Sequence, residues 1–190
     1  MVDTVFLDRD GVINIDSPDY IKNSSEFHFI PRSAEAVALL SRSGFRVIII
    51  TNQSIIGREL AGMAELEAIF AKMNKGVARF GGRIEDIFFC PHTPADNCSC
   101  RKPQPGLIDK AARRYGIDPA CSCMVGDSAK DMECAVNAGC RFSLLVRTGN
   151  GETAAGELAA KGMAPDYTGA DLMACARWIC TRLKDADPAL

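Results

Sequence analysis

Short, largely apolar runs recur along the chain, and most of them end abruptly in polar or glycine residues. They span 2–7, 46–50, 84–89, 121–125 and 141–146 of the 190 residues, and their length and composition are typical of β-strands buried on both faces. Segments with helical spacing of apolar residues lie between and after them, at 33–42, 63–80, 106–115, 130–137, 152–161 and 170–183. This alternation predicts an α/β fold: a three-layer, Rossmann-like parallel sheet with helices on both faces.

The chain is expected to form a single domain over 1–183, with 184–190 as a tail. Turn signals at Ser17-Pro18-Asp19 and Asn23-Ser24-Ser25 predict an irregular excursion over 12–30 rather than a helix. The interval between Gly11 and Thr51 must also hold a helix and a strand, so it has no room for a large cap domain.

The composition narrows the function classes. With 47% hydrophobic and 24% charged residues, the chain can bury a real core. A net charge of -2 argues against a nucleic-acid partner, and no apolar run is long enough for a membrane span. We therefore expect a soluble, cytoplasmic protein, and a monomer. In the reducing cytosol its nine cysteines are expected to serve as metal ligands or core residues rather than as disulfides.

Carboxylates gather where predicted strands end. Asp8 and Asp10 follow the first strand, and Asp127 and Asp131 follow Gly126 at the end of another. Strand ends of a parallel sheet meet at one crevice, where several carboxylates repel each other unless a cation neutralises them. Mg²⁺ suits such oxygen ligands. The alternative is that these are ordinary loop residues, with Asp127 or Asp131 serving only as a helix N-cap.

The pair Asp8 and Asp10 also suits phosphoryl transfer. One carboxylate can attack phosphorus, while the other donates a proton to the leaving oxygen and later activates water. Thr51, at the end of a strand, and Lys102 supply donors for phosphoryl oxygens.

A second cluster holds soft metal ligands. Cys90, His92, Cys98 and Cys100 lie within a single loop, 90–100. Three thiolates and one imidazole match a closed, structural Zn²⁺ site; the alternative is one buried cysteine with exposed neighbours. Because the loop leads directly into Arg101 and Lys102, a zinc ion there would stiffen the backbone that presents both cations. The six other cysteines are expected to pack in the core.

Four motifs, in order, resemble those of the haloacid-dehalogenase-like phosphohydrolases: Asp8-Arg9-Asp10-Gly11-Val12, Thr51, Lys102 ahead of Pro103, and Gly126-Asp127-Ser128-Ala129-Lys130-Asp131. The resemblance implies that Asp8 is the nucleophile and Asp10 the general acid/base. It also implies that Thr51 and Lys102 hold the phosphoryl group, and that Mg²⁺ binds Asp8, the backbone carbonyl of Asp10, and Asp127. Asp131 would be a weaker ligand or lie behind the ligands.

The zinc loop and the run Arg101-Lys102-Pro103-Gln104-Pro105-Gly106 are similar to those of the D-glycero-D-manno-heptose 1,7-bisphosphate 7-phosphatases and the related histidinol-phosphate phosphatases. Thr51-Asn52-Gln53-Ser54 favours the heptose enzymes, and the resemblance implies substrate contacts for Asn52, Gln53, Ser54 and Arg101. The expected substrate is a small phosphorylated sugar, the 7-phosphate of the heptose bisphosphate. Two alternatives stay open: histidinol-phosphate hydrolysis, with which the short spacer 93–97 agrees, and a phosphate-binding module without turnover.

Overall fold

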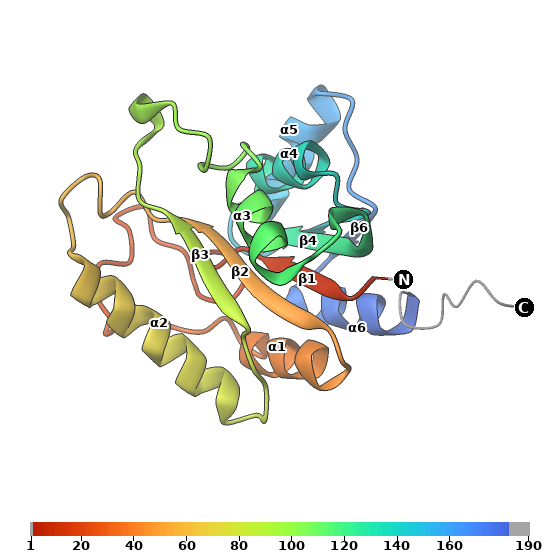
Figure 1. Ribbon diagram of the computed structural model, residues 1–190, viewed down its shortest axis with the longest axis horizontal. Helices are drawn as coiled ribbons and strands as arrows, with labels where there is room; N and C mark the ends of the chain where they lie inside the picture. The colour runs from red at the N-terminus through yellow and green to blue at the C-terminus, as the bar shows by residue number, and fades with distance from the viewer. Residues whose placement is uncertain (1, 183–190) are drawn as a thin grey trace, which may run out of the picture.

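Six parallel strands form one sheet in the computed structural model, which describes residues 2–182 (Figure 1). The strand order is β3-β2-β1-β4-β5-β6, so the first strand of the chain lies inside the sheet. The strands are β1 (Thr4–Leu7), β2 (Arg46–Asn52), β3 (Asp86–Cys90), β4 (Ser122–Gly126), β5 (Phe142–Val146) and β6 (Tyr167–Gly169).

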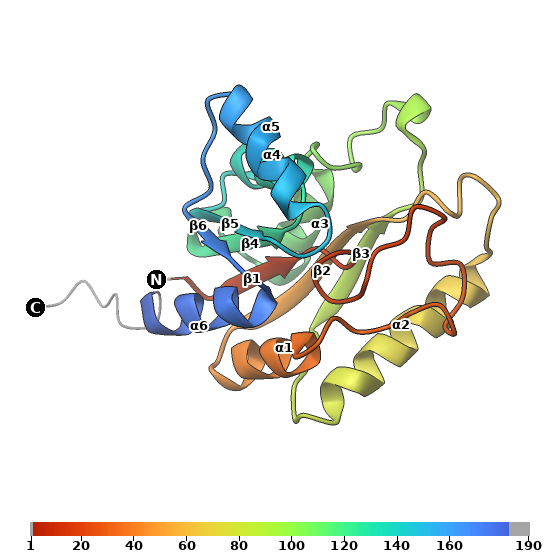
Figure 2. The same ribbon diagram turned by 180° about the vertical axis from the view of Figure 1, so that it is seen from behind.

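Six α-helices cover the two faces of this sheet. Figures 1 and 2 show α1, α2 and α6 on one face and α3, α4 and α5 on the other. Two single-turn 3₁₀ helices, at Pro94–Asp96 and Pro119–Cys121, lie in loops. The α-helices are α1 (Ser33–Arg42), α2 (Met63–Ala78), α3 (Gly106–Tyr115), α4 (Ala129–Ala138), α5 (Gly151–Ala160) and α6 (Leu172–Arg182).

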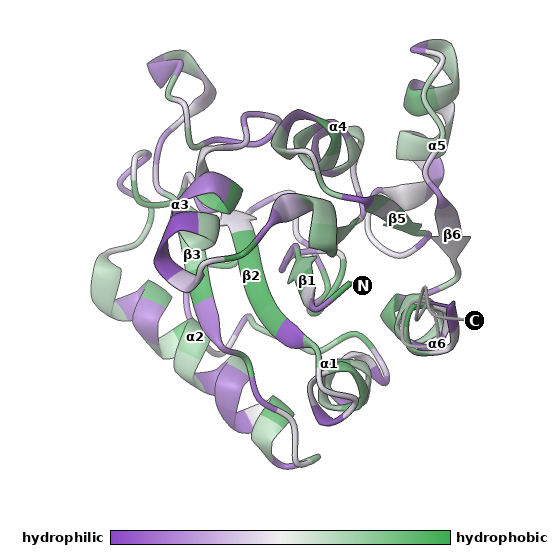
Figure 3. Cartoon of the chain, turned by 45° about the vertical axis from the view of Figure 1, so that its right-hand side comes forward, coloured by the Kyte–Doolittle hydropathy of each residue, from purple (hydrophilic) through white to green (hydrophobic). Residues whose placement is uncertain are grey.

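The strands are buried because they carry apolar side chains on both faces. Every residue of β1 and β4 is buried, and Figure 3 shows most of β2 in hydrophobic green while α2 alternates between hydrophobic and hydrophilic residues. Helix α3 is a clear case: Leu107, Ile108 and Ala111 face the core. It ends at Gly116, whose φ of 63° is the left-handed conformation that glycine adopts without strain.

The predicted α/β fold is confirmed, including the parallel sheet and the helices on both faces. Segment 12–30 is an irregular excursion held by isolated bridges from Asn14 to Asp10 and to Phe29, as expected, and no large cap is inserted in the described part of the chain. The short strand β6 was not predicted. The predicted tail, 184–190, lies outside the described residues.

The packing prediction for the cysteines is wrong in part. Cys123, Cys134 and Cys175 are buried, and the half-buried Cys140 and Cys180 pack against the core as expected, whereas Cys121 is half-buried and lies outside the core clusters. Cys121 was expected in a strand with Cys123, but it ends the turn that precedes β4, so the two thiols do not share a strand face.

Between residues 2 and 182, no helix is both long and apolar enough to cross a membrane.

Candidate active site

The carboxyl ends of the central strands converge on one cleft. Because β1 lies between β2 and β4, the residues that follow Leu7, Ile50 and Val125 come together. The cleft has a volume of about 450 Å³ and a polar lining. Of the predicted site residues, it is lined by Asp8, Asp10, Thr51, Asn52, Ser54, Arg101, Lys102 and Asp127.

A buried lysine joins two of the carboxylates. Lys102 is only 3% exposed, and its Nζ lies 2.8 Å from Asp8 Oδ1 and 2.6 Å from Asp131 Oδ1. It also donates a hydrogen bond to the Ile50 carbonyl at 2.9 Å. Burial alone would lower the pKa of Lys102, but the two carboxylates raise it. The ammonium is therefore permanently charged and fixed beside Asp8.

Both carboxylate oxygens of Asp131 have partners: Oδ1 contacts Lys102, and Oδ2 contacts Ser128 at the start of α4. Its Oδ2 accepts hydrogen bonds from the Ser128 hydroxyl at 2.6 Å and from the Ser128 N–H at 3.0 Å. With Lys102 on the other oxygen, the carboxylate is arranged to support Lys102 from behind.

Burial and neighbouring carboxylates make the ionised forms of Asp8 and Asp127 unfavourable. Burial raises the pKa of Asp8 to about 8, with Lys102 opposing and Asp131, Asp127 and Asp10 adding to the rise. The pKa of Asp127 rises to about 6, through burial and the neighbouring Asp131. Ligand oxygens of Asp8, Asp127 and Asp131 lie within 4.8 Å of one another. A divalent cation would relieve this repulsion, and oxygen donors of this kind fit Mg²⁺.

Asp10 is held by a different set of partners. Arg9, 1% exposed, donates from Nε and Nη2 to both of its oxygens at 2.7–3.2 Å. Asn14 Nδ2 and Gln53 Nε2 donate to the same carboxylate, each at 2.9 Å. Burial alone would raise the pKa of Asp10, but the Arg9 charge and these hydrogen bonds lower it. The side chain is thus fixed in one orientation as a carboxylate.

Gln53 was expected to contact substrate, and the structure places it elsewhere. It is 2% exposed, and its amide donates both to Asp10 and to the Thr51 hydroxyl, each at 2.9 Å. It therefore links the two groups from behind the cleft. Asn52 has a similar linking contact: its side chain forms two hydrogen bonds with the backbone of Lys102, at 3.1 and 3.2 Å.

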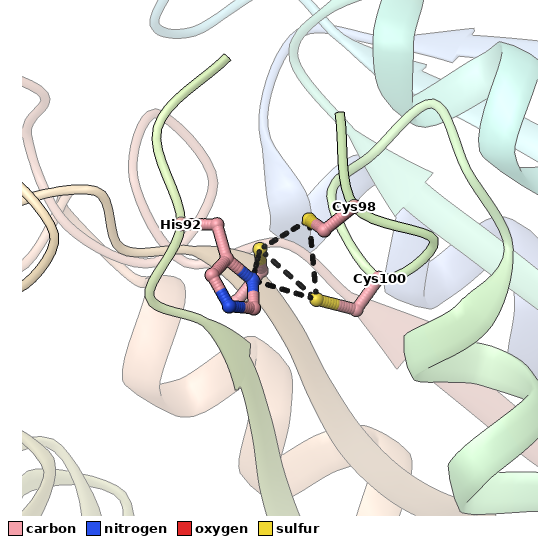
Figure 4. Close-up of side chains that lie close together, drawn as sticks. His92, Cys98 and Cys100 are labelled. Carbon is pink, nitrogen blue, oxygen red and sulfur yellow. Dashed lines mark hydrogen bonds between the residues drawn. The ribbon is translucent and has the colours of Figure 1, made fainter. Parts of the chain in front are cut away.

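The predicted zinc ligands form a second cluster next to the cleft (Figure 4). Cys100 Sγ lies 3.2 Å from Cys90 Sγ, 3.4 Å from Cys98 Sγ and 3.3 Å from His92 Nδ1. The four ligand atoms all lie within 4.8 Å of one another, and a tetrahedral Zn²⁺ site spaces its sulfurs about 3.8 Å apart. Arg101 Nη1 donates to the His92 carbonyl at 3.0 Å, which connects the cluster to the cleft.

Two residues at this site had no role predicted from the sequence. Arg9 enters the sequence analysis only as part of the first motif, and Asn150 is not among the residues it singles out. Asn150 donates to Asp127 Oδ2 from its backbone N–H at 2.8 Å and from Nδ2 at 3.2 Å. A signal for Asn150 did exist, since it follows a predicted strand, as the catalytic motifs do.

Sequence comparison connects this site to known proteins. A family model described as HAD-hydrolase-like matches residues 99–175. The D-glycero-β-D-manno-heptose-1,7-bisphosphate 7-phosphatase of Bordetella bronchiseptica is 46% identical over 77% of this chain and 82% of that protein. The Pseudomonas aeruginosa protein of the same name is 47% identical over the same shares.

Comparison of the fold with solved structures points to the same group of proteins. The D,D-heptose 1,7-bisphosphate phosphatase of B. bronchiseptica, solved with magnesium and phosphate, has a TM-score of 0.88 at 41% identity, covering 95% of this chain and 99% of that one. The Burkholderia thailandensis enzyme of that name has a TM-score of 0.68 at 40% identity, covering 92% of this chain and 96% of its own. The chain therefore belongs to the D-glycero-β-D-manno-heptose-1,7-bisphosphate 7-phosphatase family of haloacid-dehalogenase-like hydrolases.

Proposed function

We propose that this protein hydrolyses the 7-phosphate of D-glycero-D-manno-heptose 1,7-bisphosphate through an aspartyl phosphate on Asp8. The observation that carries the proposal is the cleft, in which Asp8 lies 2.8 Å from Lys102 and shares the lining with Asp10, Thr51 and Asp127. Relatives that bear the heptose phosphatase name cover about four-fifths of the chain, which supports this substrate.

In the first step, an oxygen of the Asp8 carboxylate attacks phosphorus, and the bond from phosphorus to the sugar oxygen breaks. Lys102 and the Thr51 hydroxyl bind phosphoryl oxygens and stabilise the charge that develops on them. Asp10 donates a proton to the departing sugar oxygen. The negative phosphoryl group beside Asp10 favours its protonated form, which offsets the effect of Arg9 on its pKa.

In the second step, Asp10 takes a proton from water, and the water oxygen attacks phosphorus. The acyl phosphate bond breaks, so inorganic phosphate leaves and Asp8 is restored as a carboxylate. The hydrogen bonds from Asn14 and Gln53 keep Asp10 in place for both transfers.

Mg²⁺ would be held by Asp8, the backbone carbonyl of Asp10, and Asp127. When bound, it neutralises the carboxylates and polarises a phosphoryl oxygen. Zn²⁺ would be held by Cys90, His92, Cys98 and Cys100 in a purely structural role. The convergence of three thiols and one imidazole, without a fifth ligand group in the described cluster, supports that role.

Arg101 and Ser54 line the same cleft, and we assign them to contacts with the sugar phosphate. Since none of the nine cysteines, all of which lie in the described residues, forms a disulfide, a reducing, cytoplasmic location fits this proposal. We expect a monomer, which size-exclusion chromatography with light scattering would check.

The test is a comparison of kcat/KM with Mg²⁺ on heptose 1,7-bisphosphate, fructose 1,6-bisphosphate and histidinol phosphate. We expect the heptose bisphosphate to be preferred, with phosphate released from C7. A preference for histidinol phosphate would assign the protein to the related enzyme class, and no turnover of any phosphate ester would leave a binding module.

Asp8→Asn tests the covalent step in the same assay. Loss of the nucleophile should lower kcat by at least about 10⁴-fold, while binding of inorganic phosphate is kept. Unchanged activity in this variant would refute the aspartyl phosphate.

A further inference from the structure

The loop Thr148-Gly149-Asn150, between β5 and α5, lies against the predicted cation ligands but outside the four sequence motifs. We propose that Asn150 is a positioning residue that fixes one oxygen of Asp127 and so directs the other oxygen at the cation. This inference rests on the proposed function, because it concerns the Mg²⁺ site of that reaction.

Both donors of Asn150 act on the same atom. Its N–H and its Nδ2 lie 2.8 and 3.2 Å from Asp127 Oδ2. Two donors on one oxygen restrict rotation of the carboxylate. They also occupy the lone pairs of that oxygen, so Oδ1 is the oxygen left for a cation.

The backbone of two glycines, Gly11 and Gly149, lies close to Oδ2 of Asp127. A Cβ added at Gly11 would lie 2.0 Å from this oxygen, and one added at Gly149 would lie 2.2 Å from it. Both glycines have positive φ, 75° and 60°. The loop is attached to the catalytic segment by a hydrogen bond from the Thr148 hydroxyl to the Gly11 carbonyl, at 2.6 Å. Protein atoms therefore enclose Oδ2, so a metal ion can reach Asp127 only at Oδ1.

The Asn150 amide also reaches the excursion over the cleft. Nδ2 lies 3.3 Å from Asp16 Oδ2, and Asp16 lines the cleft. One amide thus contacts a predicted cation ligand and the segment that faces substrate. The same side chain makes no capping hydrogen bond to α5, so its contacts serve the site rather than the helix.

Asn150→Ala removes the side-chain donor and leaves the backbone N–H in place. Mg²⁺ binding, measured by isothermal titration calorimetry on the zinc-loaded protein without substrate, should weaken by about tenfold. In turnover assays the Mg²⁺ concentration for half-maximal activity should rise by the same factor, with a smaller fall in kcat at saturating Mg²⁺. The melting temperature without added Mg²⁺ should fall by only about 2–4 °C, the effect of losing one side-chain hydrogen bond.

Glu152→Ala is the matched control. Glu152 lies in the first turn of the same helix and pairs with Arg147 on the surface, where it is 68% exposed. This variant should bind Mg²⁺ like the wild type. Equal Mg²⁺ affinity in Asn150→Ala and wild type, or equal weakening in both variants, would overturn the positioning role. A wild-type protein that binds no Mg²⁺ would instead overturn the cation site, and the inference with it.

Discussion

Arg9 has the largest side chain among the fully buried residues between 2 and 182, although arginine is rarely buried without a partner. Its guanidinium forms a two-pronged contact with the Asp10 carboxylate, which is the geometry in which arginine binds most specifically. Since Arg9 points into the protein, its neighbour Asp8 is left to face the cleft. The Arg9 guanidinium therefore orients Asp10, while the Arg9 backbone N–H donates to Asp8 Oδ1 at 2.7 Å.

Gln53 offers a direct test of this positioning. Gln53→Leu keeps much of the volume but removes the donor to Asp10 and Thr51. We expect kcat to fall by about 10- to 100-fold, because small misplacements of reacting groups have effects of this size, with a smaller change in KM. Stability should fall by about 1–3 kcal/mol. Steady-state kinetics and urea unfolding measure the two effects.

Gln104→Leu is the control, since the Gln104 side chain is exposed. It should retain wild-type kcat and stability. If Gln53→Leu changed KM and left kcat unaltered, Gln53 would be a substrate-binding residue, as the sequence resemblance implies.

The catalytic motifs were accessible to sequence reasoning, and their supporting residues were not. Asp8, Thr51 and Asp127 stand where strands end, so sheet geometry alone predicts that they meet. Arg9 and Asn150 act through contacts set by the fold. An arginine between two aspartates is expected to be solvated, and an asparagine between glycines is expected to form a turn.

At the level of elements, strands were predicted well because each contains a short core of consecutive apolar residues, as in Val47–Ile50 and Leu144–Val146. β6 was not predicted because it has only three residues, and two of them, Thr168 and Gly169, give no apolar strand pattern. β3 begins two residues later than predicted: the apolar run starts at Ile84, but pairing with β2 starts at Asp86.

The loop with Cys90, His92, Cys98 and Cys100 is the element whose stability should depend on metal. Cys98→Ser removes one thiolate ligand, so zinc content should fall well below one per chain. Loss of a structural metal should cost about 3 kcal/mol, a fall in Tm of roughly 10 °C. KM should rise more than kcat falls, because Arg101 is held by the His92 carbonyl. Metal analysis, calorimetry and kinetics provide the three readouts.

Cys180→Ser serves as the matched variant, because Cys180 is half-buried on α6. It should keep its zinc, its Tm and its KM. A Cys98→Ser protein that is free of zinc and as stable as the wild type would contradict a structural role for the metal.

For the whole molecule, the carboxylate cluster couples stability to pH and cation. The pKa values of Asp8 and Asp127 are raised from 3.8 to about 8 and about 6. Without a cation, their contribution to stability is therefore greatest below pH 4 and is lost as pH rises through these values. Mg²⁺ binds the ionised forms, so the rise in Tm that it causes should be larger at pH 8 than at pH 5.5.

Thermal unfolding with and without Mg²⁺ across this range checks the coupling. Asp127→Asn should flatten the pH dependence, because it removes one titrating ligand. A Tm rise of equal size at every pH would show that Mg²⁺ does not act on these carboxylates.

The hydrogen bond from Thr148 to Gly11 joins residues 137 positions apart in the chain. Translation runs from the N-terminus, so Thr148 leaves the ribosome long after Gly11 and after all four motifs, the last of which ends at Asp131. Contacts so distant in sequence form late, because a long loop must close first. A growing chain that already carries all four motifs therefore still lacks the loop that encloses Oδ2 of Asp127, and its cation site is completed only once Asn150 has folded against that carboxylate.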